Sequence, residues 1–464
     1  MTNDFGFSTK HEMKPIAGTI RKLFFATRTV KGEGGKLRFR IQPGALASPR
    51  YQARPRQTLR CPSRAAGMHQ RRRQESRANE GQADVTSPSR PAPHALAALA
   101  ALVASLGTPL AAQEADGVEP EYRTFVPSEI ANEERIDYSI WTEAMKNLVV
   151  SMGPSLREGA GRPDPSFGTR RQYGHVSRYR LEGNRVMFSF LDDKVIESFT
   201  EYRRDLEATA DKVDIQKLSR NEQLAYWINL HNVAVIERIA KDWPVRQPRE
   251  MKVDGVPLDE AKIVTVEGVA LSPRDIREKI VYPNWSDPKV IYGFWRGEIG
   301  GPSIQREAFN AENVARLLEK GASEFVNSLR GTEKAGDTLE VSELYEEAAP
   351  FYFPDFGKDL RAHLREYAQP EVIAILDETS DTRASIREWD IADLAGGVRE
   401  PTYQNITSNG VAVTTRIPQS MARLLAQREQ KFQKIIREGR TGTVTFSNLK
   451  LPGEEGEETD GEVK

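Results

Sequence analysis

The chain has 464 residues, enough for two or three domains, and a formal net charge of −1. That sum hides an asymmetry: residues 1–112 carry 19 Lys+Arg and 6 Asp+Glu, whereas residues 113–464 carry 47 and 61. The acidic body argues against nucleic acid as a partner, because such binding depends on cations that replace phosphate counterions.

The single cysteine, Cys61, lies in the basic leader. Removal of the leader leaves a mature chain without a thiol, which excludes structural disulfides, thiolate zinc sites and a cysteine nucleophile. Three of the six histidines, His175, His231 and His363, lie in the body. They are not spaced like zinc ligands, and no His-Glu-x-x-His motif occurs, so we expect neither a metal nor a cofactor.

The first 112 residues read as a leader. Residues 1–94 are rich in Arg, Pro, Ser, Gln and Gly, which predicts disorder. Residues 95–112 are uncharged, but their helical part ends at Gly107 and is shorter than the roughly 20 residues of a membrane span. They are typical of a secretory signal peptide cleaved after Ala112, which predicts a periplasmic or secreted protein without stable membrane insertion.

The translation start is a separate question. Met68 precedes three arginines, residues 71–73, which suit the charged start of a signal peptide. We therefore hypothesise that translation starts at or near Met68 and that residues 1–67 are an artefact of gene calling. The alternative is a basic tail followed by an uncleaved anchor.

Residues 113–184 form a predicted N-terminal segment. Apolar residues at helical spacing predict a helix over residues 136–150, and a Gly/Pro/Arg-rich loop follows over residues 153–175. The predicted core domain, residues 185–400, begins with a short strand over residues 185–190 and an amphipathic helix over residues 193–210.

The next helix has clear start and stop signals. Ser219 and Glu222 predict a capping box before Asn221–Ile236, and Trp243-Pro244 ends the run, since proline lacks the N–H donor. Residues 251–256 predict a hairpin with an Asp-Gly turn, and residues 290–295 are the best strand candidate in the chain.

A Gly-rich loop, residues 297–302, and a helix capped near Asn310 come next. Further helices are expected over residues 331–400. The C-terminal extension, residues 401–464, contains a charged helix over residues 419–437 and ends in an acidic tail predicted to be disordered.

Two segments carry a family resemblance: Asn221–Ile236 and the loop Tyr292–Pro302. Together they resemble the signature of the bacterial and plant family called domain of unknown function 547. Its members carry a Leu-Ala-Phe-Trp-Ile-Asn-Leu-Tyr-Asn-Ala helix and then a loop with a His, a Cys and a Cys-Pro. This chain has Ile291 at the His position and Arg296 and Gly301 at the Cys positions.

The resemblance is strongest over residues 185–330, and the family has no settled activity to carry over. A His beside two Cys suggests a cysteine nucleophile with an activating base. None of the three replacements can perform that chemistry. The chain is therefore interpreted as a degenerate member, a pseudoenzyme.

His231 stands where relatives carry Tyr. It could act as a general base, since its ordinary pKa is about 6.5. Its place on the apolar helix face favours the alternative of a neutral core residue with one hydrogen-bond partner. Asn229 and Asn232 could bind a substrate through their amides, or could tie the helix to a nearby loop backbone.

Arg296 and Glu298 could clamp a carboxylate or phosphate, with the amides of Gly297, Gly300 and Gly301 forming an anion nest. The alternative is a solvent-exposed ion pair between them, worth about 0–1 kcal/mol. The loop is no P-loop, because no Gly-Lys-Ser/Thr follows it.

These observations predict an α+β fold, dominated by helices, with a small antiparallel sheet that holds residues 290–295 beside the signature helix. A papain-like or transglutaminase-like architecture would suit the family's loop chemistry. The leading function is an exported, non-catalytic domain that binds an unknown protein or a small anionic ligand. The alternatives are a hydrolase or transferase on peptide or cell-wall-like substrates with His231 as base, and a purely structural envelope protein.

Overall fold

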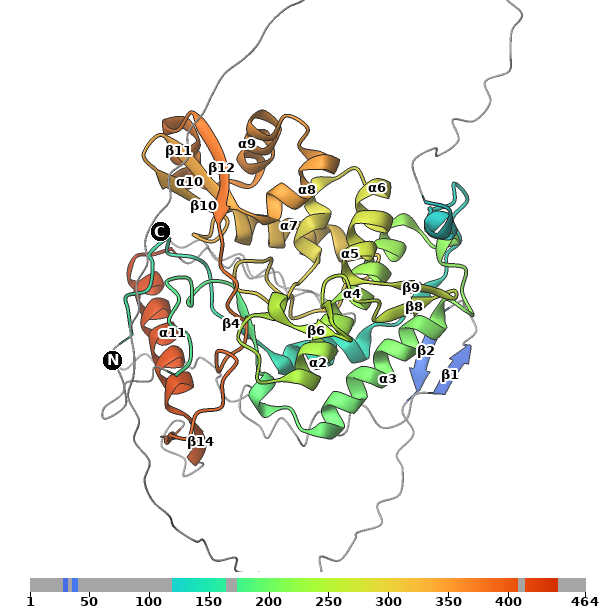
Figure 1. Ribbon diagram of the computed structural model, residues 1–464, viewed down its shortest axis with the longest axis horizontal. Helices are drawn as coiled ribbons and strands as arrows, with labels where there is room; N and C mark the ends of the chain where they lie inside the picture. Colours follow the sequence, from blue (N-terminus) through green and yellow to red (C-terminus); the bar gives the residue numbers. More distant parts are fainter. Residues whose placement is uncertain (1–27, 32–35, 41–118, 164–172, 408–413, 441–464) are drawn as a thin grey trace, which may run out of the picture. The chain divides into compact units, whose positions relative to one another are not determined.

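The computed structural model describes residues 28–31, 36–40, 119–163, 173–407 and 414–440. All of these residues belong to one compact unit of the chain. Helices dominate and the strands are short, so the predicted α+β class is confirmed (Figure 1).

The α-helices are α2 (Ser139–Leu148), α3 (Asp193–Thr209), α4 (Arg220–Asp242), α5 (Pro273–Asp275), α6 (Tyr282–Asn284), α7 (Val314–Val326), α8 (Leu344–Tyr352), α9 (Phe356–Tyr367), α10 (Pro370–Glu378) and α11 (Gln419–Arg437). The 3-10 helices are η2 (Pro120–Phe125), η3 (Phe188–Phe190), η4 (Ile215–Lys217), η5 (Pro248–Glu250) and η7 (Pro288–Gly293), and η6 (Ile276–Val281) is a π-helix. The strands are β1 (Arg28–Lys31), β2 (Lys36–Arg40), β3 (Arg135–Ile136), β4 (Val149–Ser151), β5 (Asn184–Val186), β6 (Lys252–Val253), β7 (Val256–Pro257), β8 (Val264–Val266), β9 (Val269–Leu271), β10 (Thr332–Ala335), β11 (Thr338–Ser342), β12 (Asp381–Ile386), β13 (Tyr403–Thr407) and β14 (Thr414–Pro418).

Helix α4, the predicted signature helix, is the central element of the core. The Ser219 hydroxyl accepts the Glu222 N–H at its start, and the helix ends before Trp243-Pro244 as predicted. A full capping box would also have the Glu222 carboxylate accept the Ser219 N–H, and that part of the prediction is wrong. The Glu222 carboxylate instead accepts the N–H groups of Ile136 and Ala311. Elements β3, α3, α5, η6 and α7 pack against α4, so it is buried on nearly every side.

The sheets are small and separate. Strands β4–β5, β6–β7, β8–β9 and β13–β14 form antiparallel pairs, and β6–β7 is the predicted Asp-Gly hairpin. In the three-stranded β10–β11–β12 sheet, β11 pairs antiparallel with β10 and parallel with β12. The predicted strand over residues 185–190 is confirmed only at its start: β5 ends at Val186, and the 3-10 helix η3 follows.

The predicted strand over residues 290–295 is wrong, and with it the placement of a sheet beside α4. The segment forms η7 because Pro288 occupies its first turn and the Asp287 side chain caps it by accepting the Lys289 N–H. The side chain of Asn232 on α4 then satisfies the backbone carbonyl of Gly293 and N–H of Trp295, at 2.9 Å each. These groups therefore need no partner strand.

Two segments of the predicted leader are strands, so the prediction that residues 1–94 lack regular structure does not hold there. Leu37 and Phe39 alternate with Lys36, Arg38 and Arg40, which is the two-residue period of a strand. Strand β2 pairs antiparallel with β1 and parallel with β3.

Helix α11 has the predicted bounds and completes a second, smaller core. That core joins residues from the N-terminal segment, the middle of the chain and the C-terminal extension: Met152, Met187, Leu394, Ala395, Ile417, Met421, Ala422 and Leu424.

Several predicted features lie outside the described residues: the signal peptide at 95–112, its cleavage site, Cys61 and the acidic tail. Within the described ranges, no helix combines the length and the apolar character that a membrane crossing requires.

Candidate functional site

The two asparagines of α4 fasten the helix to backbone segments, as the structural alternative proposed. The Asn229 amide donates to the Phe309 carbonyl at 2.7 Å and accepts the Phe309 N–H at 3.1 Å. Asn232 binds Gly293 and Trp295 in the same manner, and both asparagines are buried. Their amides are occupied by the protein itself.

His231 is fully buried and held between two partners. Its Nδ1 lies 3.0 Å from the Asn232 side-chain oxygen, and its Nε2 lies 3.1 Å from Arg277 Nη1. An arginine can only donate, so Nε2 must accept and the ring proton must lie on Nδ1. Burial, followed by the charge of Arg277, lowers the pKa of His231 to about 3. The ring is therefore neutral and has no exposed nitrogen.

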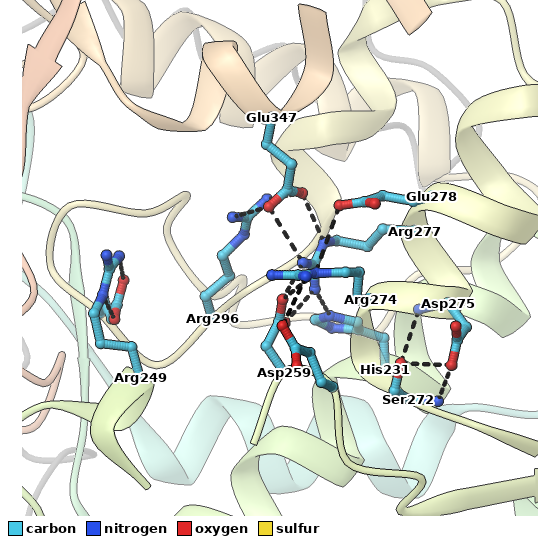
Figure 2. A network of polar contacts seen from close by, with 12 residues as sticks. His231, Arg249, Asp259, Ser272, Arg274, Asp275, Arg277, Glu278, Arg296 and Glu347 are labelled. Carbon is cyan, nitrogen blue, oxygen red and sulfur yellow. Dashed lines mark hydrogen bonds and ion pairs between the residues drawn. The ribbon is translucent and has the colours of Figure 1, made fainter. Parts of the chain in front are cut away.

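Arg277 is the centre of a buried polar cluster, which consists of His231, Asp259, Arg277, Arg296 and Glu347 (Figure 2). Its two terminal nitrogens each donate to Asp259 at 2.8 Å, and its Nε and Nη2 donate to Glu347 at 3.1 and 3.4 Å. With the bond to His231, all five guanidinium N–H groups have an acceptor. Although burial raises the pKa of Asp259, the charge and hydrogen bonds of Arg277 bring it below its ordinary value.

The π-helix η6 places Arg277 in this position. The capping box of Ser272 and Asp275 starts α5, and the chain widens into η6 directly after it. π-Helical turns are rare and often mark functional sites, because the irregular backbone re-aims side chains. No feature of the sequence analysis singled out this segment.

Arg296 and Glu347 complete the cluster. Arg296 donates both terminal nitrogens to the two carboxylate oxygens of Glu347, at 2.7 and 2.5 Å. The two side chains are 20% and 19% exposed. Burial alone would raise the pKa of Glu347, but Arg296 and Arg277 lower it to about 2. This fork-on-fork geometry is the strong form of the ion pair.

Glu298 forms a second ion pair on the same loop. Arg249 donates its Nε and Nη2 to the two Glu298 oxygens at 2.7 Å each, and Nη2 also donates to Glu343. The Arg249 guanidinium lies 4.4 Å from the ring centre of Trp389. Burial raises the pKa of Glu298, and Arg249 opposes that effect. The predicted ion pair between Arg296 and Glu298 is therefore wrong. Arg296 pairs with Glu347 and Glu298 pairs with Arg249, each about fifty residues away in the sequence.

The N–H groups of the loop glycines donate to backbone carbonyls of the protein. The Gly300 N–H donates to the Glu388 carbonyl at 2.9 Å, and a Cβ at Gly300 would lie 2.4 Å from that oxygen. The Gly301 N–H points to the Glu298 carbonyl at 3.4 Å. Both amides are engaged within the protein, so the predicted anion nest is not formed by these two residues.

Arg296 and Gly301 lie close together across the loop. A Cβ built on Gly301 would lie 3.9 Å from the Cβ of Arg296, within the usual disulfide range of about 3.5–4.5 Å. Ile291 is fully buried. Among the residues that the structure describes, no three His, Cys, Asp or Glu side chains gather to hold a metal ion.

Comparison with known proteins identifies the family. Residues 215–326 match the family described as "Protein of unknown function, DUF547". The match contains α4, η6, η7, the Gly-rich loop and α7. The chain therefore contains a DUF547 domain over these residues. No curated protein and no solved structure matches it.

The structure thus brings His231 and Arg296 into one cluster and places Glu298 in a separate pair. It adds three residues that the sequence analysis missed: Asp259, Arg277 and Glu347. These three residues lie far apart in the sequence, so no local motif connects them.

Proposed function

We propose that this chain is an exported member of the DUF547 family whose domain binds a ligand or a protein partner and catalyses no reaction. One observation carries the proposal. The cluster around Arg277 contains no thiol or hydroxyl nucleophile, and His231 is buried with Nε2 accepting from Arg277. Its two carboxylates, Asp259 and Glu347, are held in ion pairs by Arg277 and Arg296. A base must come within hydrogen-bond reach of the proton that it removes.

The way in which the loop is fixed supports a binding role. Arg296 and Glu298 anchor the loop to α8 and to Arg249 through bidentate pairs. Backbone bonds from Ile299 and Gly300 reach Asp390 and Glu388. A loop held at several points offers a preformed surface, and preformed surfaces lose little entropy when they bind.

The compartment is proposed on the sequence alone. The uncharged segment 95–112 and the basic residues before it suit a protein that is exported and processed. N-terminal sequencing and intact mass of native protein test this. A mature start near residue 113 is expected, and any peptide from residues 1–67 contradicts the proposed translation start.

The sharpest test of the functional proposal is a comparison of wild type with His231→Gln. Glutamine keeps hydrogen-bonding groups and similar bulk but cannot act as a base. Both proteins are assayed for turnover on peptide, ester and peptidoglycan substrates, with circular dichroism as the check of folding. We expect equal background rates. A wild-type turnover that the variant loses while it keeps its fold would establish the hydrolase alternative.

A further inference from the structure

Helix α11 closes the second, smaller core of the protein from one side. Its contribution to that core consists of Met421, Ala422 and Leu424. The other side, which we call the seat, consists of Met152, Met187, Leu394, Ala395 and Ile417. Methionine side chains are flexible and polarisable, and surfaces that contain them adapt to helices of different sequence. The seat is therefore chemically suited to more than one helix.

Lys431 places a charge inside the contact between α11 and the rest of the protein. The residue is only 6% exposed, and its Nζ donates to the Leu181 carbonyl at 2.6 Å. Among the described residues, this ammonium group forms no ion pair with a carboxylate. A buried charge without a carboxylate partner is costly, because it gives up its hydration and regains little.

The charged groups that face Lys431 do not compensate for this burial. Glu182 and Glu324 favour its charged form, but both carboxylates are directed at Arg330. Glu324 accepts from Arg330 Nη2 at 2.6 Å, and Glu182 lies 3.9 Å from Arg330 Nη1. Arg330 and Arg185 oppose the charge of Lys431. Burial is the largest effect, and the pKa of Lys431 is lowered to about 8. The docking of α11 is thus weaker than its apolar contacts alone would make it.

We infer that α11 is a detachable latch, and that the seat beneath it binds an amphipathic helix of a protein partner that carries an uncharged residue in place of Lys431. The fit of α11 shows that an amphipathic helix matches the seat, and a helix laid into an apolar groove is a common mode of protein recognition. Detachment of one terminal helix is a local opening, which requires less free energy than global unfolding. A partner helix without the buried charge avoids the cost that α11 carries, so it displaces α11. This inference rests on the proposed binding function and names its partner class.

Fluorescence anisotropy of a labelled peptide tests the inference on the mature chain, residues 113–464. The peptide has the sequence of α11, residues 419–437, with Lys431→Met, so it presents the same apolar face without the buried charge. It should bind the wild-type protein. Lys431→Met in the protein should weaken that binding about tenfold or more, because the protein's own latch then docks without the cost. Gln430→Met, at an exposed position of α11, is the matched control and should change nothing.

The pH dependence of peptide binding is an independent readout on the wild-type protein. The pKa of Lys431 is lower in the docked latch than in a detached helix, so docking tightens as the pH rises from about 8 toward the ordinary lysine value of 10.5. The peptide should therefore bind wild type more weakly at pH 9.5 than at pH 7. Its binding to the Lys431→Met protein should be equal at the two pH values.

The outcomes separate the latch from the proposed function. Peptide binding that Lys431→Met weakens and Gln430→Met preserves supports the inference. Equal binding to all three proteins, or no binding to any of them, overturns it and leaves the proposed function standing. Dimers of the wild-type protein that disappear in Lys431→Met would assign the seat to α11 of a second copy and overturn the partner assignment. The proposed function fails separately, through turnover that depends on His231, which these variants leave unchanged.

Discussion

Removal of the Glu347 charge is expected to destabilise the fold by about 3 kcal/mol at pH 7. The pKa of this carboxyl falls from 4.5 to about 2 in the folded protein, because Arg296 and Arg277 hold its anion. A difference of about 2.5, at roughly 1.4 kcal/mol for each pH unit, gives about 3 kcal/mol. Loss of one partner from a buried pair costs a similar ~3–5 kcal/mol.

The contribution of the Glu347 carboxylate to stability depends on pH. The folded pKa is lower than the unfolded value, so the stabilisation is complete above about pH 4.5 and is lost as the pH falls toward 2. The difference in unfolding free energy between wild type and Glu347→Gln should therefore shrink by about 2 kcal/mol between pH 7 and pH 3.

Urea unfolding followed by tryptophan fluorescence measures both quantities. Glu346→Gln is the matched control, since Glu346 is the exposed neighbour on α8 and its side chain has no hydrogen bond or ion pair among the described residues. It should change stability by less than about 0.5 kcal/mol. A Glu347→Gln effect below 1 kcal/mol, or one that is constant from pH 7 to pH 3, would refute the reasoning.

Three further changes test other parts of the structure. Gly397→Ala should lower the free energy of unfolding by about 4 kcal/mol or more, because φ is +65° and the new Cβ would lie 1.7 Å from a backbone oxygen. Gly336→Ala is the control: φ is +62° but the space around it is open, so it should cost only about 1 kcal/mol. Thermal unfolding of the two variants compares these costs. The double variant Arg296→Cys with Gly301→Cys should form a disulfide, seen as a mass 2 Da below the dithiol, in keeping with the 3.9 Å Cβ separation; persistent free thiols under oxidising conditions would contradict it. Asn232→Ala should cost about 3 kcal/mol in urea unfolding, since three buried groups lose their partner, and a cost below 1 kcal/mol would argue against that network.

The elements that the sequence predicted are those with local causes. Ser219 caps α4 and Trp243-Pro244 ends it, so its bounds could be read from adjacent residues. The amphipathic spacing in α3 gave its extent equally well. The segment at 290–295 failed for a distant reason. An apolar run suits either a strand or a buried helical turn, and the Asn232 side chain that satisfies its backbone lies about sixty residues earlier.

The candidate site was predicted only in part. Arg296 stood out because it replaces a reactive position in a recognisable loop, and Glu298 because it is a second charge on that loop. Their partners, Glu347 and Arg249, lie about fifty residues away on either side, and no local pattern connects them. Arg277 was missed because its burial depends on η6, and a π-helix has no start signal of the kind that caps supply.

The state of the His231 ring tests the central claim most directly. Proton–nitrogen NMR of histidine-labelled protein, with His231→Gln to assign the signal, reports which nitrogen carries the proton from pH 5 to pH 8. We expect a neutral ring protonated at Nδ1, unchanged over this range, because burial and Arg277 lower its pKa to about 3. A ring that titrates near pH 6–7 would place a functional base in the cluster and contradict a non-catalytic role.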